Sequence, residues 1–210
     1  MEKGIVIKST GSWYLVKRTN GEIIEARIRG KLRTKGLRTT NPVAVGDIVS
    51  LEKNEDNFVI TEIGERRNYI IRKSTNLSKE AHIIASNVDQ TLLIATINHP
   101  VTSAVFIDRI LATTEAYNIP AILVFNKSDL YDNTDREKAT ELITIYSEIG
   151  YRCLQVSAVT GQNITELREL LKDKVTVLSG MSGVGKSTLI NCIEPQLQLK
   201  TASISDSHDT

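Results

Sequence analysis

Hydrophobic and polar residues alternate in five short runs over the first 65 positions of the chain. The runs are GIVIKS, WYLVK, EIIEARI, DIVSLE and FVITEI, and their β-branched and aromatic residues favour strands. Turn signals such as Asn20-Gly21 and Val45-Gly46-Asp47 separate them. Five short strands at this spacing predict a small all-β barrel over residues 1–65.

A second pattern begins at residue 82, after a basic and weakly periodic stretch at 66–81 that we interpret as a linker. Strand-like runs (HIIAS, QTLLIATI, AILVF, YRCLQVS, VTVLSG) now alternate with helix-like runs, the last of which is KSTLINCI. The helix at 135–149 is predicted to start with a capping box of Thr134 and Glu137, and Asn163 is the expected N-cap of the next helix. Alternating strands and helices predict an open, largely parallel α/β sheet over residues 82–210.

The composition is that of a globular protein without a membrane span. Hydrophobic residues make up 40% of the chain and charged residues 24%, and no apolar run approaches the roughly 20 residues that cross a bilayer. Cys153 and Cys192 belong to no metal-binding or redox motif, so we interpret them as small buried hydrophobes. These features predict a cytoplasmic protein.

The net charge of +1 hides an asymmetry between the two halves. Residues 1–50 hold ten Lys and Arg against four Asp and Glu, whereas residues 51–210 hold sixteen against twenty-one. A basic barrel of the oligonucleotide-binding (OB) type fits RNA, although a solvated strand and loop would show the same charges. Trp13 and Tyr14 fit core packing better than base stacking. The candidate RNA-binding residues are Arg27, Arg29, Lys31, Arg33, Lys35 and Arg38.

A phosphate-binding motif lies near the carboxyl end of the chain. Residues 180–187, GMSGVGKS, match the P-loop pattern G-x-x-x-x-G-K-[ST], with an apolar strand before them and an apolar helix after them. The glycines let backbone N–H groups surround a phosphate, the lysine reaches the β- and γ-phosphates, and the serine hydroxyl can ligate Mg²⁺. We predict nucleotide binding by Gly180, Met181, Ser182, Gly183, Val184, Gly185, Lys186, Ser187 and Thr188, with Ser187 as the Mg²⁺ ligand.

Two further motifs predict that the base is guanine. Asn126, Lys127, Ser128 and Asp129 follow the buried strand AILVF. The Asp129 carboxylate can accept hydrogen bonds from N1–H and the 2-amino group of guanine, a donor pair that adenine lacks. The Lys127 stem can cover one face of the ring. After the next strand, Ser157 and Ala158 place a backbone N–H where it can approach guanine O6.

Together these motifs resemble the G4, G5 and G1 elements of GTPases, in an order that is typical of a circularly permuted GTPase. RGKLR (29–33), PVAVGDIV (42–49) and ASNVDQTLLI (85–94) resemble the RsgA/YjeQ family. The resemblance implies a GTP hydrolase that uses GTP, GDP and Mg²⁺, is stimulated by the small ribosomal subunit, binds rRNA and acts in late subunit assembly. We further predict a monomer.

The chain also departs from that family. It contains no DxxG element and no complete switch I, and the family's carboxyl-terminal zinc domain is not in the sequence, so Zn²⁺ is expected only in that domain. We therefore expect a truncated chain with little or no turnover, and we assign no residue to activation of the hydrolytic water. Two alternatives stay open: an RNA-binding switch that senses guanine nucleotides without significant turnover, and another permuted ribosome-assembly GTPase.

Overall fold

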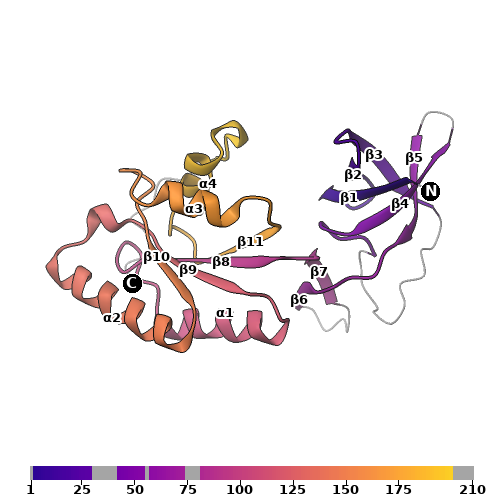
Figure 1. Cartoon of the computed structure of the whole chain (residues 1–210). Helices are drawn as coiled ribbons and strands as arrows, with labels where there is room; N and C mark the ends of the chain where they lie inside the picture. The colour runs from indigo at the N-terminus through magenta and orange to yellow at the C-terminus, as the bar shows by residue number, and fades with distance from the viewer. Residues whose placement is uncertain (1, 30–41, 55–56, 74–80, 201–210) are drawn as a thin grey trace. The chain divides into compact units, whose positions relative to one another are not determined.

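The chain folds into two compact units, Met1–Val88 and Asp89–Thr210. The computed structural model describes residues 2–29, 42–54, 57–73 and 81–200 (Figure 1). Over these ranges no helix has the length and hydrophobicity needed to cross a membrane. The division falls after Val88, whereas the sequence suggested that the second domain begins at residue 82.

The first unit contains the predicted barrel. Its strands close in the order β1-β2-β3-β5-β4, with only β3 and β5 running parallel. Alternate residues point inward, and Tyr14 is 1% exposed, which confirms core packing for this residue. The strands are β1 (Glu2–Ser9), β2 (Tyr14–Arg18), β3 (Ile23–Ile28), β4 (Ile48–Asn54) and β5 (Asn57–Ile63).

The stretch interpreted as a linker contains a strand. β6 (Tyr69–Lys73) pairs antiparallel with β7 (Ala81–Ser86), so residues 69–73 form a strand within the stretch interpreted as a linker. A buried ion pair joins this hairpin region to the barrel: Asp47, fully buried, accepts two bonds from Arg66 at 2.7 Å and one from Ser86 Oγ at 2.6 Å. The β6–β7 hairpin is therefore part of the barrel unit.

The second unit is built on a four-stranded parallel sheet in the order β10-β9-β8-β11. Asp89 accepts a hydrogen bond from the Val175 N–H at 2.8 Å just before β8 and β11 begin. The strands are β8 (Gln90–Ala95), β9 (Ala121–Phe125), β10 (Arg152–Gln155) and β11 (Thr176–Ser179). The α-helices are α1 (Ala104–Ala116), α2 (Asn133–Ile149), α3 (Ile164–Leu171) and α4 (Lys186–Ile193), with 3₁₀ turns η1 (Ser128–Leu130) and η2 (Pro195–Leu197).

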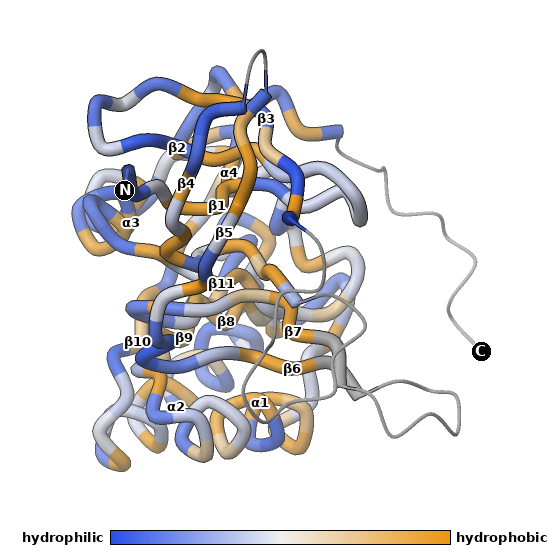
Figure 2. Tube along the Cα trace, turned by 90° about the vertical axis from the view of Figure 1, so that its right-hand side faces the viewer, coloured by the Kyte–Doolittle hydropathy of each residue, from blue (hydrophilic) through white to orange (hydrophobic). Residues whose placement is uncertain are grey.

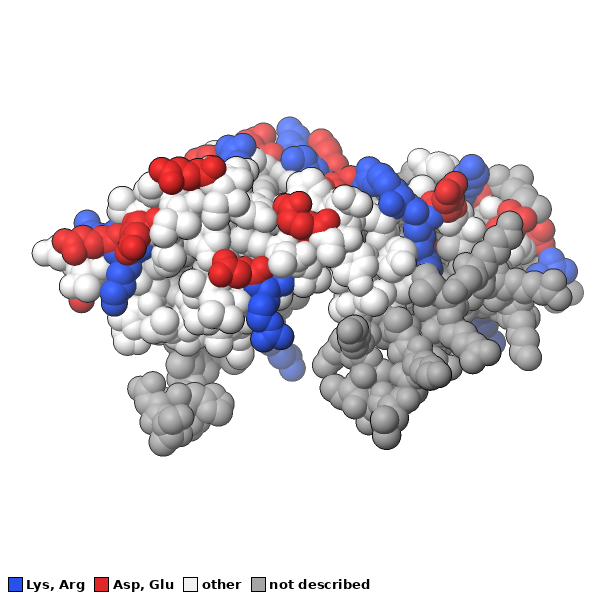
Figure 3. Space-filling view, turned by 90° about the horizontal axis from the view of Figure 1, so that it is seen from below, with Lys and Arg blue, Asp and Glu red and all other residues white. Residues whose placement is uncertain are grey.

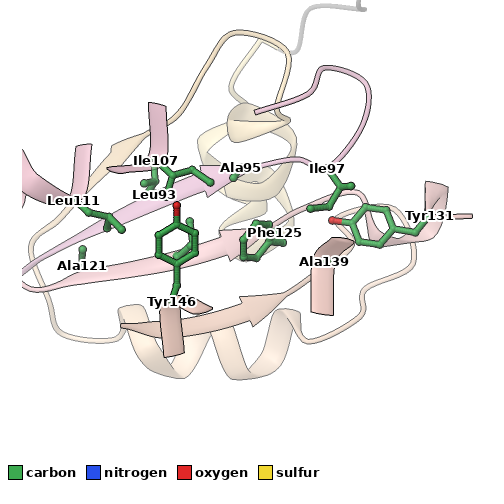
Figure 4. Packing of buried hydrophobic residues seen from close by; sticks show 11 residues of the cluster. Leu93, Ala95, Ile97, Ile107, Leu111, Ala121, Phe125, Tyr131, Ala139 and Tyr146 are labelled. Carbon is green, nitrogen blue, oxygen red and sulfur yellow. The ribbon is translucent and has the colours of Figure 1, made fainter. Parts of the chain in front are cut away.

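Helices cover both faces of this sheet because successive strand residues point to opposite sides. Leu93, Ala95 and Phe125 pack with α1 and α2 on one face (Figure 4). Leu92 and Ile94 pack with α3 and α4 on the other. Helix α1 carries both hydrophobic and hydrophilic segments (Figure 2), and its buried residues Ile107, Leu111 and Thr114 recur every three to four positions, as expected of a helix with one buried face.

One helix start differs from the sequence prediction, and another agrees in position but not in its capping hydrogen bond. Helix α2 begins at Asn133, and its N-cap is Asp132, whose carboxylate accepts from the Asp135 N–H at 2.8 Å, rather than Thr134. Asn163 does occupy the N-cap position of α3, but its side chain bonds to the Gln155 carbonyl instead of capping the helix.

Candidate nucleotide-binding site

Four loops leave the sheet at one edge, where the carboxyl ends of the parallel strands meet. Phe125 pairs with both Ala95 and Gln155, and Ser179 pairs with Leu93. The loops that follow these strands therefore start side by side, and this edge is where open α/β sheets bind ligands. The loops are residues 96–103, 126–132, 156–163 and 180–185.

The P-loop needs glycine at two positions for steric reasons as well as for its left-handed backbone. A Cβ at Gly180 (φ 147°) would lie 2.4 Å from the Ile94 carbonyl oxygen. A Cβ at Gly185 (φ 88°) would lie 2.6 Å from Asn126 Nδ2. Only glycine lets this loop pass so close to β8 and to the 126–132 loop.

Lys186 lies across the loop that precedes it. Its ammonium donates to the carbonyl oxygens of Gly180, at 2.9 Å, and Met181. Partial burial lowers the pKa of Lys186 below its ordinary value.

Val184 is fully buried and anchors the loop in the core beneath α4. The remaining predicted residues frame the loop: Ser182 and Gly183 are exposed at its tip, Ser187 is half-buried in the first turn of α4, and Thr188 is exposed.

Asn126 connects the P-loop to the adjacent loop. Its Nδ2 donates to the Val184 carbonyl oxygen at 2.9 Å, and the residue is only 1% exposed. Among the described residues its Oδ1 atom has no hydrogen-bond partner. A buried oxygen without a partner is unfavourable in a folded protein, so this atom indicates a place where a ligand donor can bind.

The 126–132 and 156–163 loops are held together by side chains. The hydroxyl of Ser157, which is fully buried, donates to Asp129 Oδ1 and accepts from the N–H groups of Val159 and Thr160. Ser128 Oγ donates to Gln162 Oε1 at 2.8 Å. Asp129 therefore has a fixed carboxylate, and Ala158, which follows Ser157, is fixed with it.

Lys127 has a left-handed backbone (φ 65°) and reaches across to the first loop. Its ammonium donates to the carbonyl oxygen of His99, and partial burial lowers its pKa. The sequence analysis did not predict any residue of the 96–103 loop as part of this site. The available signal was the position of the loop directly after a buried parallel strand, as for the other three loops.

Two family sequence models match successive parts of the chain. The sequence model of the RsgA GTPase matches residues 63–210, and that of the RsgA N-terminal domain matches residues 3–59. The chain belongs to the RsgA GTPase family. A Bacteroides fragilis protein named "Small ribosomal subunit biogenesis GTPase RsgA" is 53% identical over 99% of this chain, and one from Phocaeicola vulgatus with the same name is 55% identical. The chain spans 67% of the length of either relative.

Solved structures of the family share the fold. The crystal structure of YjeQ from Thermotoga maritima matches with a TM-score of 0.78 and 37% identity, covering 96% of this chain and 68% of that one. YloQ, described as a circularly permuted GTPase, matches with a TM-score of 0.73 and 30% identity, covering 93% of this chain and 66% of that one. The order of motifs along β9, β10 and β11 confirms the permuted GTPase fold.

The predicted RNA-binding residues are only partly described. Arg27 stacks over the Trp13 ring at 3.6 Å from its centroid, and Arg29 forms an ion pair with Glu52 at 2.6 Å. On the described surface of the face in Figure 3, basic and acidic residues are interspersed. Lys31, Arg33, Lys35 and Arg38 lie outside the described residues.

Proposed function

We propose that the chain binds GTP and GDP through the four loops at the carboxyl edge of its parallel sheet, and that it acts as a GTP hydrolase in the biogenesis of the small ribosomal subunit, with the low turnover expected of a sequence that contains no DxxG element. The observation that carries the proposal is the hydrogen bond from Asn126 to Val184, which joins the guanine-reading loop to the P-loop. The names of the relatives support the ribosomal role.

The described residues fit a guanine nucleotide. The glycine loop and Lys186 suit the phosphates, because backbone N–H groups and an ammonium together bind an anion. The fixed Asp129 carboxylate suits the donor edge of guanine, and Ala158 N–H suits O6. Mg²⁺, when bound with the nucleotide, neutralises phosphate charge during transfer, and the Ser187 hydroxyl is its proposed protein ligand. The nucleotide-binding residues that the sequence predicts are the proposed contacts of the nucleotide.

We also propose that the barrel unit binds rRNA. Arg27 is held against Trp13, so its charge is presented from a fixed position. Phosphate contacts by such residues make affinity depend on salt. The chain is proposed to act as a monomer in the cytoplasm, where it would meet small subunits.

The ribosomal proposal is tested by GTP turnover with and without purified subunits. Small subunits are expected to raise the rate of phosphate release, and large subunits to leave it unchanged. Equal rates in all three conditions, with GDP still bound, would favour the alternative in which the nucleotide only sets RNA affinity. Stimulation by large subunits alone would favour another permuted ribosome-assembly GTPase.

The RNA assignment is tested by the salt dependence of small-subunit binding. Replacing Arg27 with Ala should weaken binding at every salt concentration and reduce the slope of log K against log salt by about 1. Arg152→Ala, which removes an exposed arginine of the second unit, is the control. An unchanged slope for Arg27→Ala removes this residue from the RNA surface.

A further inference from the structure

The loop after β8 is closed by its own hydrogen bonds. Thr96 N–H donates to Thr102 Oγ1 at 3.0 Å, and Thr102 N–H donates back to the Thr96 carbonyl oxygen at 2.9 Å. Thr96 Oγ1 donates to the Pro100 carbonyl oxygen at 2.5 Å. Thr96 is 0% exposed and Thr102 is 6% exposed. Two buried threonines thus fix the conformation of residues 96–102, which we name the brace loop.

The brace loop contacts two of the other loops of the site. The carbonyl oxygen of His99 accepts the hydrogen bond from the Lys127 ammonium. Pro100 lies beside the tip of the P-loop, since a Cβ at Gly183 would be 3.3 Å from Pro100 Cδ. One rigid loop therefore supports both the lysine of the base-reading motif and the exposed glycine of the phosphate-binding motif.

Fixing the ammonium matters because a lysine side chain is otherwise highly flexible. Its stem has four carbons and many rotamers, and a free side chain loses this freedom when a ligand packs against it. An ammonium already bonded to a fixed carbonyl holds the stem in place before the ligand arrives. The stem of Lys127 is the part that is proposed to cover the guanine ring.

We propose that Thr96 and Thr102 are positioning residues for nucleotide binding, which act by holding the His99 carbonyl oxygen where it orients Lys127. The inference rests on the proposed function, because it assumes that the four loops bind a guanine nucleotide. Neither threonine needs to touch the nucleotide. Their effect passes through Lys127.

The test begins with Thr96→Val, which keeps the shape of the side chain and removes the hydroxyl that bonds to Pro100. Thr114→Val is the matched control, because Thr114 is also a buried threonine of the second unit whose Oγ1 donates to a backbone carbonyl, that of Leu111, at 2.7 Å. We expect the dissociation constant of a fluorescent GDP analogue to rise about threefold to tenfold in Thr96→Val. It should change less than about twofold in Thr114→Val and in Thr96→Ser, which keeps the hydroxyl.

A double-mutant cycle separates positioning from general destabilisation. Lys127→Met keeps an apolar stem and removes the ammonium that binds His99. In the Lys127→Met background, the change in log Kd caused by Thr96→Val should be less than half of the change that Thr96→Val causes in the wild type, because the shared interaction is already lost. Full additivity, or an equal loss in Thr96→Val and Thr114→Val, would overturn the inference.

A second variant covers the case in which Thr96→Val does not fold. Thr102→Val removes the acceptor at the other end of the brace loop, with Thr102→Ser as its rescue, and the same pattern is expected. If the wild-type chain binds no GDP, the proposed function fails. If the wild type binds GDP and both valine variants bind it equally well, only the positioning role fails.

Discussion

The Asn126 side-chain amide and the Val184 carbonyl oxygen are joined by a 2.9 Å hydrogen bond across 58 residues of sequence. One end of this bond follows β9 and the other lies in the P-loop that follows β11. A single side chain thereby fixes the spacing between the loop proposed to read the base and the loop proposed to hold the phosphates.

Replacing Asn126 with Ala should weaken GDP binding about tenfold or more, because Val184 is left with a buried unpaired carbonyl and the two loops lose their connection. Isothermal titration calorimetry measures the change. Asn191→Ala is the control, since the Asn191 side chain bonds to the backbone of Leu199 and lies outside the four loops. Equal affinities for the wild type and Asn126→Ala would show that the connection is irrelevant to binding.

Replacing Asp129 with Asn should exchange the base preference of the site. The amide presents an N–H donor where the carboxylate presented an acceptor, so it loses a bond to the 2-amino group of guanine and can donate to the 2-oxo group of xanthine. Competition between GDP and xanthosine diphosphate for a fluorescent nucleotide should shift toward xanthosine diphosphate by about a hundredfold. If Asp129→Asn leaves the preference between GDP and xanthosine diphosphate unchanged, the base does not contact Asp129.

The strands of the barrel and the motifs of the site could be predicted because each has characteristic residue types at a fixed spacing in the sequence. β6 could not, for a physical reason. Its apolar residues Ile70 and Ile71 are consecutive, and the register of its pairing with β7 shifts between them. The alternation that marks a half-buried strand is therefore absent.

The brace loop was missed for a different reason. His99 acts through its backbone carbonyl, and any residue has one, so its side chain gives no signal in the sequence. The N-cap of α2 was misplaced because Asp132 and Thr134 are both good capping residues, and the backbone geometry that selects Asp132 is not visible in the residue types.

Breaking the buried ion pair of the barrel should destabilise that unit strongly. Asp47→Ala removes the fully buried carboxylate that pairs with Arg66, whose side chain is only 14% exposed, and should lower the free energy of unfolding by about 3–5 kcal/mol. The emission of Trp13, the single tryptophan of the chain, reports on this unit during denaturation. Glu52→Ala, which removes the exposed partner of Arg29, should cost about 1 kcal/mol or less. If Asp47→Ala and Glu52→Ala lower the free energy of unfolding by similar amounts, burial does not make the Asp47–Arg66 pair the more important of the two.

Tyr131 should make the second unit less stable at high pH. Burial raises the pKa of Tyr131 above its ordinary value of 10, and its hydroxyl donates to the Asn126 carbonyl oxygen at 3.2 Å. The folded state therefore keeps the proton longer than the unfolded state, so this stabilisation is complete below pH 10 and is lost as the pH rises above it. Between about pH 9 and pH 11, denaturant unfolding should show a steeper fall for the wild type than for Tyr131→Phe. If the free energies of unfolding of the wild type and of Tyr131→Phe fall in parallel with pH, Tyr131 is not the cause of the lost stability.

The most direct test of the account is a calorimetric titration of the wild-type chain with GDP, inosine diphosphate and ADP. The account predicts affinity in that order, because inosine lacks the 2-amino group that Asp129 is proposed to bind and adenine lacks both donors. The expected gap between GDP and ADP is about a hundredfold or more. ADP binding as tightly as GDP would contradict the claim that these four loops form a guanine-specific site.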